Sequence, residues 1–359
     1  MPLSRIVNLL TLYVRLNFPA MVLCNHREQN RQQRINVFEV LKAKAMPAPS
    51  QNDIISSLTF PHITSYVPVN GTGDAAYALT YEFATTSQPA DNLWSYSGWT
   101  AFTSAQKNVV RNALAQIETF LNVSFTEVTG DSNPNINFGR VNLSYGVAGE
   151  AGCTQPITRW DASVMYDRNE TLLDAYGIHV VTHEIGHALG LDHTFQNVLL
   201  DTNYDNNHYS TMSYTSDPIA GGYLEYMGLY DILALQSFFG ASSYNTGNNS
   251  YTGPRSYETD VIWDTGGTDT FDASAVGHSV ILNLRPGHYS TFGLKEDVAI
   301  AYGVDIENAL GSNSNDLLKG NALDNTLSGN GGNDLIIARG GDDSMNGNSG
   351  RDIMQGRGG

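Results

Sequence analysis

The spacing of apolar residues along the 359-residue chain predicts a region of mixed helices and strands, followed by a region of different texture. The stretch YALTYEFAT (77–85) alternates apolar and polar residues, as a half-buried strand does. Residues 103–122 instead repeat apolar positions every three to four residues, which predicts a helix with Thr103 or Ser104 as N-cap. The predicted buried stripe of this helix is Val109, Val110, Leu114, Ile117 and Leu121.

The same patterns predict two more strands and two more helices. VSFTEV (123–128) and NINFG (135–139) are typical of strands. Helical periodicity runs from about residue 172 to 189, where Gly190 is placed to end the helix, and again over 229–240. After Gly240 only short apolar runs remain among Gly, Asn and Asp, which predicts short strands and turns without helices.

The charge of the chain mainly serves to exclude one class of partner. The net charge is −17, but residues 1–50 hold seven Lys/Arg against two Glu, so the rest of the chain carries −22. Such an acidic body argues against nucleic acid as a partner and is compatible with binding of cations. No apolar run reaches the roughly 18 residues of a membrane span. The longest candidate, IVNLLTLYVRLNF, is interrupted by Arg15, and no convincing cleavage site for a signal peptide follows.

The N-terminal residues 1–60 form the least structured part of the pattern. Their composition predicts no core, so they are interpreted as a basic pro-segment or as sequence upstream of the true start. Cys24 lies here and could pair with Cys153, although two cysteines make no disulfide framework.

Nine-residue repeats dominate the last fifty residues, starting at Gly311. Five consecutive units keep one register, with an acidic or amide residue at the sixth place and an apolar residue at the eighth. The sixth places are Asp316, Asn325, Asp334, Asp343 and Asp352, and the eighth are Leu318, Leu327, Ile336, Met345 and Met354. This is the pattern of a calcium-binding parallel β-roll, in which carboxylates and carbonyls supply oxygen ligands. A flexible Gly/Asn linker would not keep an apolar residue at every ninth place.

The strongest chemical signal is HEIGHALGLDH at 183–193. His183 and His187 stand four apart on the predicted helix, so both imidazoles can reach one zinc ion. Gly190 allows a sharp reversal that brings His193 round as third ligand. Glu184 lies between the first two and would act as general base on a zinc-activated water. The alternative, a histidine-rich helix end, does not require the glycine and the third histidine at these places.

Some twenty residues later, HYSTMSYTSD places Met212 where a methionine-containing turn would lie beneath the metal. Tyr214 could bring its phenol near the zinc, as a neutral donor to an oxyanion; the alternative is a tyrosine packed under the site.

These motifs, together with YDILALQ and the nine-residue repeats, resemble the serralysin family of secreted bacterial zinc metalloproteases over roughly residues 75–359. The resemblance implies an α+β metzincin catalytic domain followed by an all-β parallel β-roll with RTX repeats. It implies zinc on His183, His187 and His193, with Tyr214 as a neighbour that swings aside to stabilise the transition state. Implied domains are 61–242 for the catalytic domain and 243–359 for the β-roll.

The resemblance also implies several structural calcium ions in the roll. Expected ligands are Asn245, Gly247, Asn249, Asp264, Gly266, Gly267, Asp269, Asp305, Glu307, Gly311, Asp316, Gly329, Gly331, Asp334, Asp343 and Asp352. The first two repeats are degenerate, so their sites are expected to be weaker.

The expected function is broad hydrolysis of extracellular proteins and peptides by a secreted monomer, with a proteinaceous inhibitor as a further partner. Substrates are expected to lie antiparallel along an exposed edge strand within about 145–167. Three features differ from the family: the chain stops within the repeats, the N-terminus is basic, and two cysteines are present. One alternative is a calcium-dependent adhesin or matrix protein with an inactive protease domain, although ligands, base and turn are all intact. Astacin-like or matrixin-like proteases are the other alternative, and the repeats argue against them.

Overall fold

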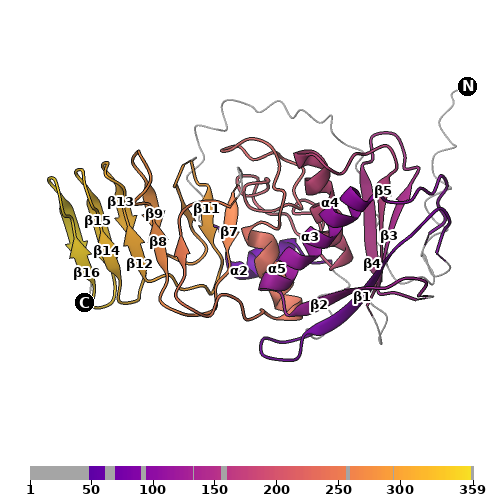
Figure 1. Ribbon diagram of the computed structural model, residues 1–359, viewed down its shortest axis with the longest axis horizontal. Coiled ribbons are helices and arrows are strands. Elements are labelled where there is room, and N and C mark those ends of the chain that lie inside the picture. The colour runs from indigo at the N-terminus through magenta and orange to yellow at the C-terminus, as the bar shows by residue number, and fades with distance from the viewer. Residues whose placement is uncertain are drawn as a thin grey trace, which may run out of the picture.

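The computed structural model describes residues 48–60, 69–89, 94–131, 133–154, 160–255, 259–293 and 295–356. These residues form an α/β domain joined to a stack of short parallel strands (Figure 1). Cys24 and the possible signal peptide lie outside the described residues, whereas Cys153 is a buried thiol on strand β4. No helix of the described residues is long and apolar enough to cross a membrane.

One five-stranded sheet supports the first domain, with strand order β2-β1-β3-β5-β4. Its strands are β1 (Tyr77–Phe83), β2 (Val123–Glu127), β3 (Ile136–Val141), β4 (Gly149–Thr154) and β5 (Asp161–Asp167). The first three are the strands that the alternating patterns predict. β4 is the edge strand and the only one that runs antiparallel to its neighbour. An antiparallel edge strand therefore lies within the range that the sequence analysis expected, although Gly149, Ala151, Gly152 and Cys153 of β4 are buried.

Two predicted helices of this domain are confirmed with small shifts. α3 (Ser104–Phe120) has Thr103 as N-cap in a capping box with Gln106, and its stripe is buried at Val110, Leu114 and Ile117. α4 (Ala175–Ala188) begins three residues later than predicted, because the Asp174 side chain caps it by accepting from the backbone N–H of Gly177.

The third predicted helix of this domain and one unpredicted helix pack against each other. α5 (Leu229–Phe239) ends at Gly240, whose φ is +70°. α2 (Gln51–Ser57) packs on it and buries Ile54, Leu58 and Phe60. The expectation that residues before about 60 contribute no core is therefore wrong for residues 54–60. The reason is that a seven-residue helix carries too few apolar positions to show a period.

The C-terminal part is a parallel β-roll. Two sheets face each other, with orders β16-β14-β12-β8-β6 and β17-β15-β13-β9, and a third, β10-β11-β7, adjoins the first domain. The strands are β6 (Ser250–Tyr251), β7 (Asp260–Ile262), β8 (Thr270–Asp272), β9 (Ile281–Asn283), β10 (Tyr289–Ser290), β11 (Val298–Ile300), β12 (Asn308–Leu310), β13 (Leu317–Lys319), β14 (Thr326–Ser328), β15 (Leu335–Arg339), β16 (Ser344–Asn346) and β17 (Ile353–Gly356). Leu327 pairs with Met345 and Leu318 with Ile336, so one coil takes two repeats, or 18 residues.

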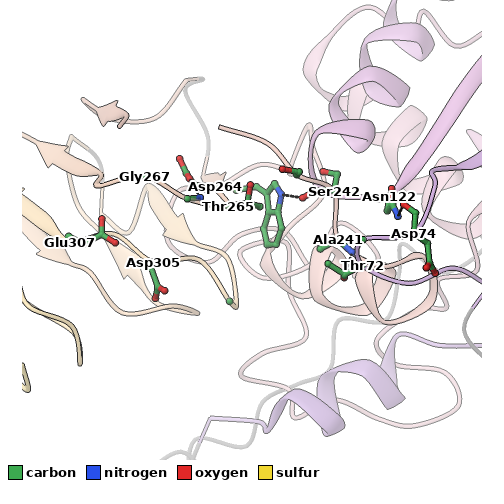
Figure 2. A pocket seen from close by; sticks show the side chains of 15 residues that line it. Thr72, Asp74, Asn122, Ala241, Ser242, Asp264, Thr265, Gly267, Asp305 and Glu307 are labelled. Carbon is green, nitrogen blue, oxygen red and sulfur yellow. Dashed lines mark hydrogen bonds between the residues drawn. The ribbon is translucent and has the colours of Figure 1, made fainter. Parts of the chain in front are cut away.

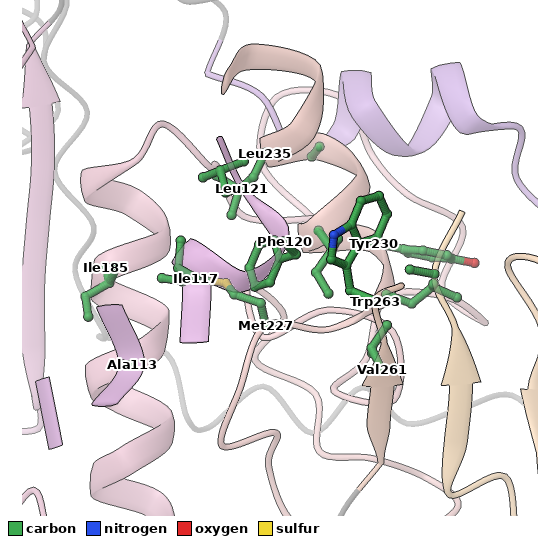
Figure 3. Close-up of a cluster of buried hydrophobic side chains, with 14 of the residues drawn as sticks. Ala113, Ile117, Phe120, Leu121, Ile185, Met227, Tyr230, Leu235, Val261 and Trp263 are labelled. Atoms are coloured by element: carbon green, nitrogen blue, oxygen red, sulfur yellow. The ribbon is translucent and has the colours of Figure 1, made fainter. Parts of the chain in front are cut away.

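A continuous core joins the two domains. Figure 3 shows Val261 and Trp263 of the roll beside Phe120 and Tyr230 of the first domain. The indole N–H of Trp263 also donates to the Ser242 carbonyl over 3.2 Å. Burial of these large side chains couples the stability of the roll to that of the first domain.

A buried histidine forms a second link across this junction. His208 has a fully buried side chain; its Nδ1 lies 3.0 Å from Asp217 Oδ2 and its Nε2 lies 3.4 Å from Glu296 Oε2, on the roll. Burial alone would lower the pKa of His208, but the hydrogen bonds to the two carboxylates outweigh it and raise the pKa. The hydrogen bond from His208 in turn holds the pKa of Glu296 below its ordinary value.

The His208→Gln variant is expected to be destabilised by about 2 kcal/mol near pH 6, where the imidazolium pairs with both carboxylates. Because the pKa is raised in the folded state, this contribution is complete below the unfolded pKa of about 6.5 and is lost as pH rises through the folded value. Thermal unfolding of both proteins between pH 6 and 9 measures it. A difference that grows with pH would contradict the charged pairing.

Candidate active site

Helix α4 and the turn after it bring three imidazoles together. His183 and His187 lie one helical turn apart, and Gly190, with φ of +99°, reverses the chain toward His193. Their Nε2 atoms are 3.1 Å apart for 183–187, 3.1 Å for 187–193 and 3.3 Å for 183–193. Ligands about 2.0–2.1 Å from one tetrahedral zinc ion stand roughly 3.3 Å from each other. The three buried nitrogens therefore fit a zinc site.

Backbone carbonyls fix the orientation of two of these rings. His183 Nδ1 lies 2.8 Å from the Thr211 carbonyl, and His187 Nδ1 lies 2.8 Å from the Leu191 carbonyl. A proton on each Nδ1 donates to the carbonyl and leaves the lone pair of Nε2 directed at the shared centre. The rings are thus preorganised as neutral ligands.

Glu184 is fully buried beside this centre, and neither carboxylate oxygen has a hydrogen-bond partner among the described residues. Burial, reinforced by the Glu150 carboxylate, raises the pKa of Glu184 well above its ordinary value. An isolated buried carboxylate is costly to ionise, so its position calls for a nearby positive charge or a water to bind.

Glu184 reaches the edge strand. A Cβ built at Gly149 on β4 would stand 2.6 Å from Glu184 Cγ and 2.7 Å from its Oε1. The first residue of β4 and the carboxylate are therefore in direct contact, which places the start of this edge strand beside the histidine centre.

The Gly149→Ala variant is expected to lower kcat about tenfold or more, because the new methyl group displaces the Glu184 carboxylate by a fraction of an ångström. Zinc content should stay unchanged, since the three atoms nearest to the new methyl group all belong to Glu184. Steady-state peptide hydrolysis and metal analysis check both. Gly277→Ala is the matched control, because nothing lies within 4 Å of that position; equal kcat in the two variants would contradict the contact.

Met212 and Tyr214 lie where the sequence analysis expected them. Met212 is buried beneath α4, and a Cβ at Gly186 would come within 2.6 Å of its sulfur. The Tyr214 ring lies 4.6 Å from the His193 ring and 5.7 Å from the His183 ring, measured between centroids. The tyrosine is thus a neighbour of two of the three imidazoles.

Two residues that support the site are missed by motif reasoning. Asp231 on α5 accepts hydrogen bonds from Ser210 Oγ, Thr211 N and Gly228 N, and so fixes the segment whose carbonyl orients His183. Burial raises the pKa of Asp231 to about 7. The signal available in the sequence is its place in the first turn of α5, where a carboxylate caps a helix.

Phe60 is the other missed residue. Its ring stacks on His187 with centroids 5.8 Å apart, and the adjoining backbone pairs with the loop of the third histidine, with Asp192 N donating to the Leu58 carbonyl over 2.9 Å. No local pattern could indicate this contact, because Phe60 lies more than 120 residues before His187 in the chain.

The expected calcium ligands before the repeats gather at the junction of the domains. Asp264, Gly266, Gly267, Asp305 and Glu307 line a pocket of about 660 Å³, which Figure 2 shows facing Thr72, Asp74 and Asn122. Asp269 donates its N–H to Glu307 Oε2 over 2.7 Å. Burial, with Asp264 and Glu307 nearby, raises the pKa of Asp269 to about 6.

The loop of Asn245, Gly247 and Asn249 lies against this group. Asn249 N donates to Asp269 Oδ1 over 2.7 Å, and its own Oδ1 is buried without a hydrogen-bond partner among the described residues. A Cβ at Gly267 would collide with the Gly247 carbonyl at 2.3 Å. The structure thus brings all the expected residues of this region together, with oxygen atoms that suit a hard cation.

Successive coils repeat one carboxylate cradle in the roll. Asp316 N donates to Asp334 Oδ1 and Asp334 N to Asp352 Oδ1, each across 18 residues. The second oxygen of Asp334 is buried without a partner among the described residues, and a Cβ at Gly329 would overlap it. A Cβ built at Gly311 would likewise lie 2.6 Å from Asp316 Oδ2 and 2.7 Å from the Gly329 carbonyl oxygen.

The remaining expected repeat ligands follow the same 18-residue spacing. Asp343 Oδ1 accepts from Asn325 N, and Gly331 faces Asn313 of the coil before it. The side-chain amide of Asn325 donates to the Glu307 carbonyl and to Asn321 Oδ1. These protein contacts take the place of a carboxylate at this position, which agrees with the weaker calcium site expected at a degenerate repeat.

Two family models match the sequence. The one described as Peptidase M10 serralysin C terminal matches residues 232–356, and the one described as Metallo-peptidase family M12 matches residues 78–227. Together they span the sheet, the histidine centre and the roll.

Individual proteins are similar over the same region. Serralysin B of Dickeya chrysanthemi is 33% identical over 324 residues, which cover 77% of this chain and 66% of that protein. Serralysin of Photorhabdus luminescens is 33% identical over 295 residues, covering 70% and 60%. Serralysin of Proteus mirabilis is 33% identical over 301 residues, covering 67% and 61%. The chain therefore spans 60–66% of the length of these three relatives.

Proposed function

Because the chain belongs to the serralysin family, we propose that it is a zinc-dependent endopeptidase that hydrolyses proteins and peptides. The observation that supports this most is the convergence of three histidine Nε2 atoms within 3.3 Å beside a buried, unpartnered glutamate. An ion-binding helix with no hydrolytic role would gain nothing from that carboxylate. Zinc, when bound, supplies a Lewis acid that makes water nucleophilic near neutral pH.

The residues of the chain divide the remaining work. Glu184 takes the proton of the attacking water and passes it to the leaving amine, since it is the carboxylate next to the histidine centre. Tyr214, beside the His183 and His193 rings, donates its O–H to the oxyanion that develops on the substrate carbonyl. Met212, which is buried beneath α4, and Gly190, which reverses the chain toward His193, position the three histidine ligands.

The substrate lies along β4. The outer edge of that strand carries no neighbouring strand among the described residues, so an extended peptide can add there as an antiparallel sixth strand. Main-chain hydrogen bonds of this kind are independent of side chains, which favours broad specificity. Contact between Gly149 and Glu184 brings the scissile bond to the carboxylate.

Calcium stabilises the roll in this proposal. The cradles of Asp316, Asp334 and Asp352 and the junction group of Asp264, Asp269 and Glu307 present carboxylates and carbonyls at close range. We place the protein outside the cell, as a monomer, with protein substrates and a proteinaceous inhibitor as its partners.

Casein or gelatin hydrolysis by the zinc- and calcium-loaded chain tests the proposal. Activity should disappear when zinc is removed by a chelator that leaves calcium bound, and should return on adding zinc. The alternative, a calcium-dependent adhesin with an inactive protease domain, predicts zinc content near zero and no hydrolysis in any condition.

A further inference from the structure

A second pocket, of about 480 Å³, lies at the junction of the domains and plays no part in the zinc site or in the calcium loops. The first domain lines it from the loop before α5 and from the start of α5. The roll lines it from β9, β10 and β13. Its walls carry an unusual combination of tyrosine rings and unneutralised cations.

Three basic side chains line the pocket: Arg285, His288 and Lys319. Burial, reinforced by nearby Arg339, holds the pKa of Arg285 below its ordinary value. Burial, with Arg285, Arg339 and Lys319 close by, does the same to the pKa of His288. The cations therefore lie close enough to repel one another.

No acidic residue of the described part of the chain forms an ion pair with them. None of the ion pairs in the described part of the chain involves Arg285, Lys319 or Arg339. Arg285 makes one long hydrogen bond, to Asn283 Oδ1 at 3.4 Å, and the buried Nε of Arg339 has no partner among the described residues. Glu296, the one carboxylate of the described lining, is already engaged by His208.

This concentration of positive charge runs against the composition of the roll. Residues 243–359 hold seven Lys/Arg and fifteen Asp/Glu, a net charge of −8, yet three of the seven cations gather around this pocket. Like charges placed together without partners cost free energy, so an anion bound among them would be strongly favoured. The chain before Ala48 carries five net positive charges and is not a complementary occupant.

The rest of the lining is mainly aromatic. Five tyrosines line the pocket, namely Tyr204, Tyr209, Tyr230, Tyr289 and Tyr302, against three aliphatic side chains, Ala48, Leu229 and Ile281. The Tyr209 and Tyr230 rings are stacked with centroids 5.0 Å apart. Tyr204 and Tyr302 are partly exposed, so ring faces and phenol oxygens are available together. Such walls suit a ligand that has a ring with an apolar face and a hydroxylated rim.

We propose that this pocket binds an acidic sugar, a saccharide unit whose ring packs on the tyrosines and whose anionic group is held by Arg285 and Lys319. The lining of this site contains none of the residues of the zinc centre, and the site would let the proposed enzyme attach to anionic polysaccharide independently of substrate binding at β4.

Isothermal titration of the full zinc- and calcium-loaded chain at low salt tests the proposal, with glucuronate, glucose and inorganic phosphate as probes. Glucuronate should bind more tightly than both others, since only it combines ring and charge. Arg285→Gln and Tyr204→Leu should each weaken it about tenfold. Arg351→Gln, which removes an exposed cation elsewhere on the roll, is the matched control and should leave the affinity unchanged.

Three outcomes would overturn the proposal. If glucuronate does not bind, the proposed site does not exist. If phosphate binds as tightly as glucuronate, the sugar ring contributes nothing to binding. Equal affinities of Arg285→Gln and Arg351→Gln remove the role of the cluster. The comparison of the three probes on the unmodified chain holds even if a variant fails to fold. Attachment of an oligomer of glucuronate more tightly than the monomer separates a polysaccharide from a free sugar acid.

Discussion

Replacing Glu184 with glutamine is expected to lower kcat/KM for peptide hydrolysis by about 10²–10⁴-fold, the usual contribution of a general base. The amide has nearly the shape of the carboxylate, but it cannot take a proton from water. His183 and His187 keep their positions, because their orientation depends on the carbonyls of residues 211 and 191 and not on Glu184. Zinc content and thermal unfolding should therefore match those of the unmodified chain, which separates a loss of chemistry from a loss of the site.

Glu150→Gln is the matched control for Glu184→Gln. Glu150 is a half-buried carboxylate on β4, close enough to help raise the pKa of Glu184. Its replacement removes the same charge from the same neighbourhood and should leave most of the activity. If both variants lose activity equally, the local charge matters and the proton transfer assigned to Glu184 is wrong. If Glu184→Gln stays active, another group is the base.

The zinc site could be predicted from the sequence because all its ligands lie within eleven residues. A helical repeat and one glycine fix the relative positions of His183, His187 and His193, so local geometry alone determines the centre. The roll could also be predicted from local sequence, since each coil of its repeats consists of two nine-residue units with the same pattern of residues.

What could not be predicted depends on contacts between distant segments. Phe60 stacks on His187 although it lies in no motif, and Asp231 fixes the segment that orients His183, a role that its place in YDILALQ does not indicate. The tyrosine and arginine pocket is composed of Ala48 and of residues between 204 and 319 that no spacing rule relates. Such features arise from how the two domains pack together, and packing leaves no periodic signal in the sequence.

Removal of calcium is expected to unfold the roll of residues 243–356. Asp316, Asp334 and Asp352 lie one above another in successive coils. Burial, with Asp316 and Asp352 as neighbours, raises the pKa of Asp334, so without a cation the stacked carboxylates repel at neutral pH. Strands β13 and β14 each contribute only one buried apolar side chain, Leu318 and Leu327, to offset this. A site with calcium at 1,000 times its Kd contributes about 4 kcal/mol, so the loss of several exceeds the usual stability of a domain.

Circular dichroism and thermal unfolding with calcium and with a calcium chelator measure this effect. The strand signal of the roll should disappear on chelation, and the first domain should unfold at a lower temperature because Trp263 and Val261 belong to its core. Asp334→Asn should raise the calcium concentration needed for folding, since it removes the buried carboxylate between two coils. Asp324→Asn is the control, because that carboxylate is exposed and its Oδ1 only accepts the Asp342 N–H, which an amide oxygen can also do. A spectrum unchanged by chelation would contradict calcium binding between the stacked carboxylates. Equal calcium requirements in the two variants would also contradict it, because the repulsion and its neutralisation by calcium are both assigned to the buried carboxylates alone.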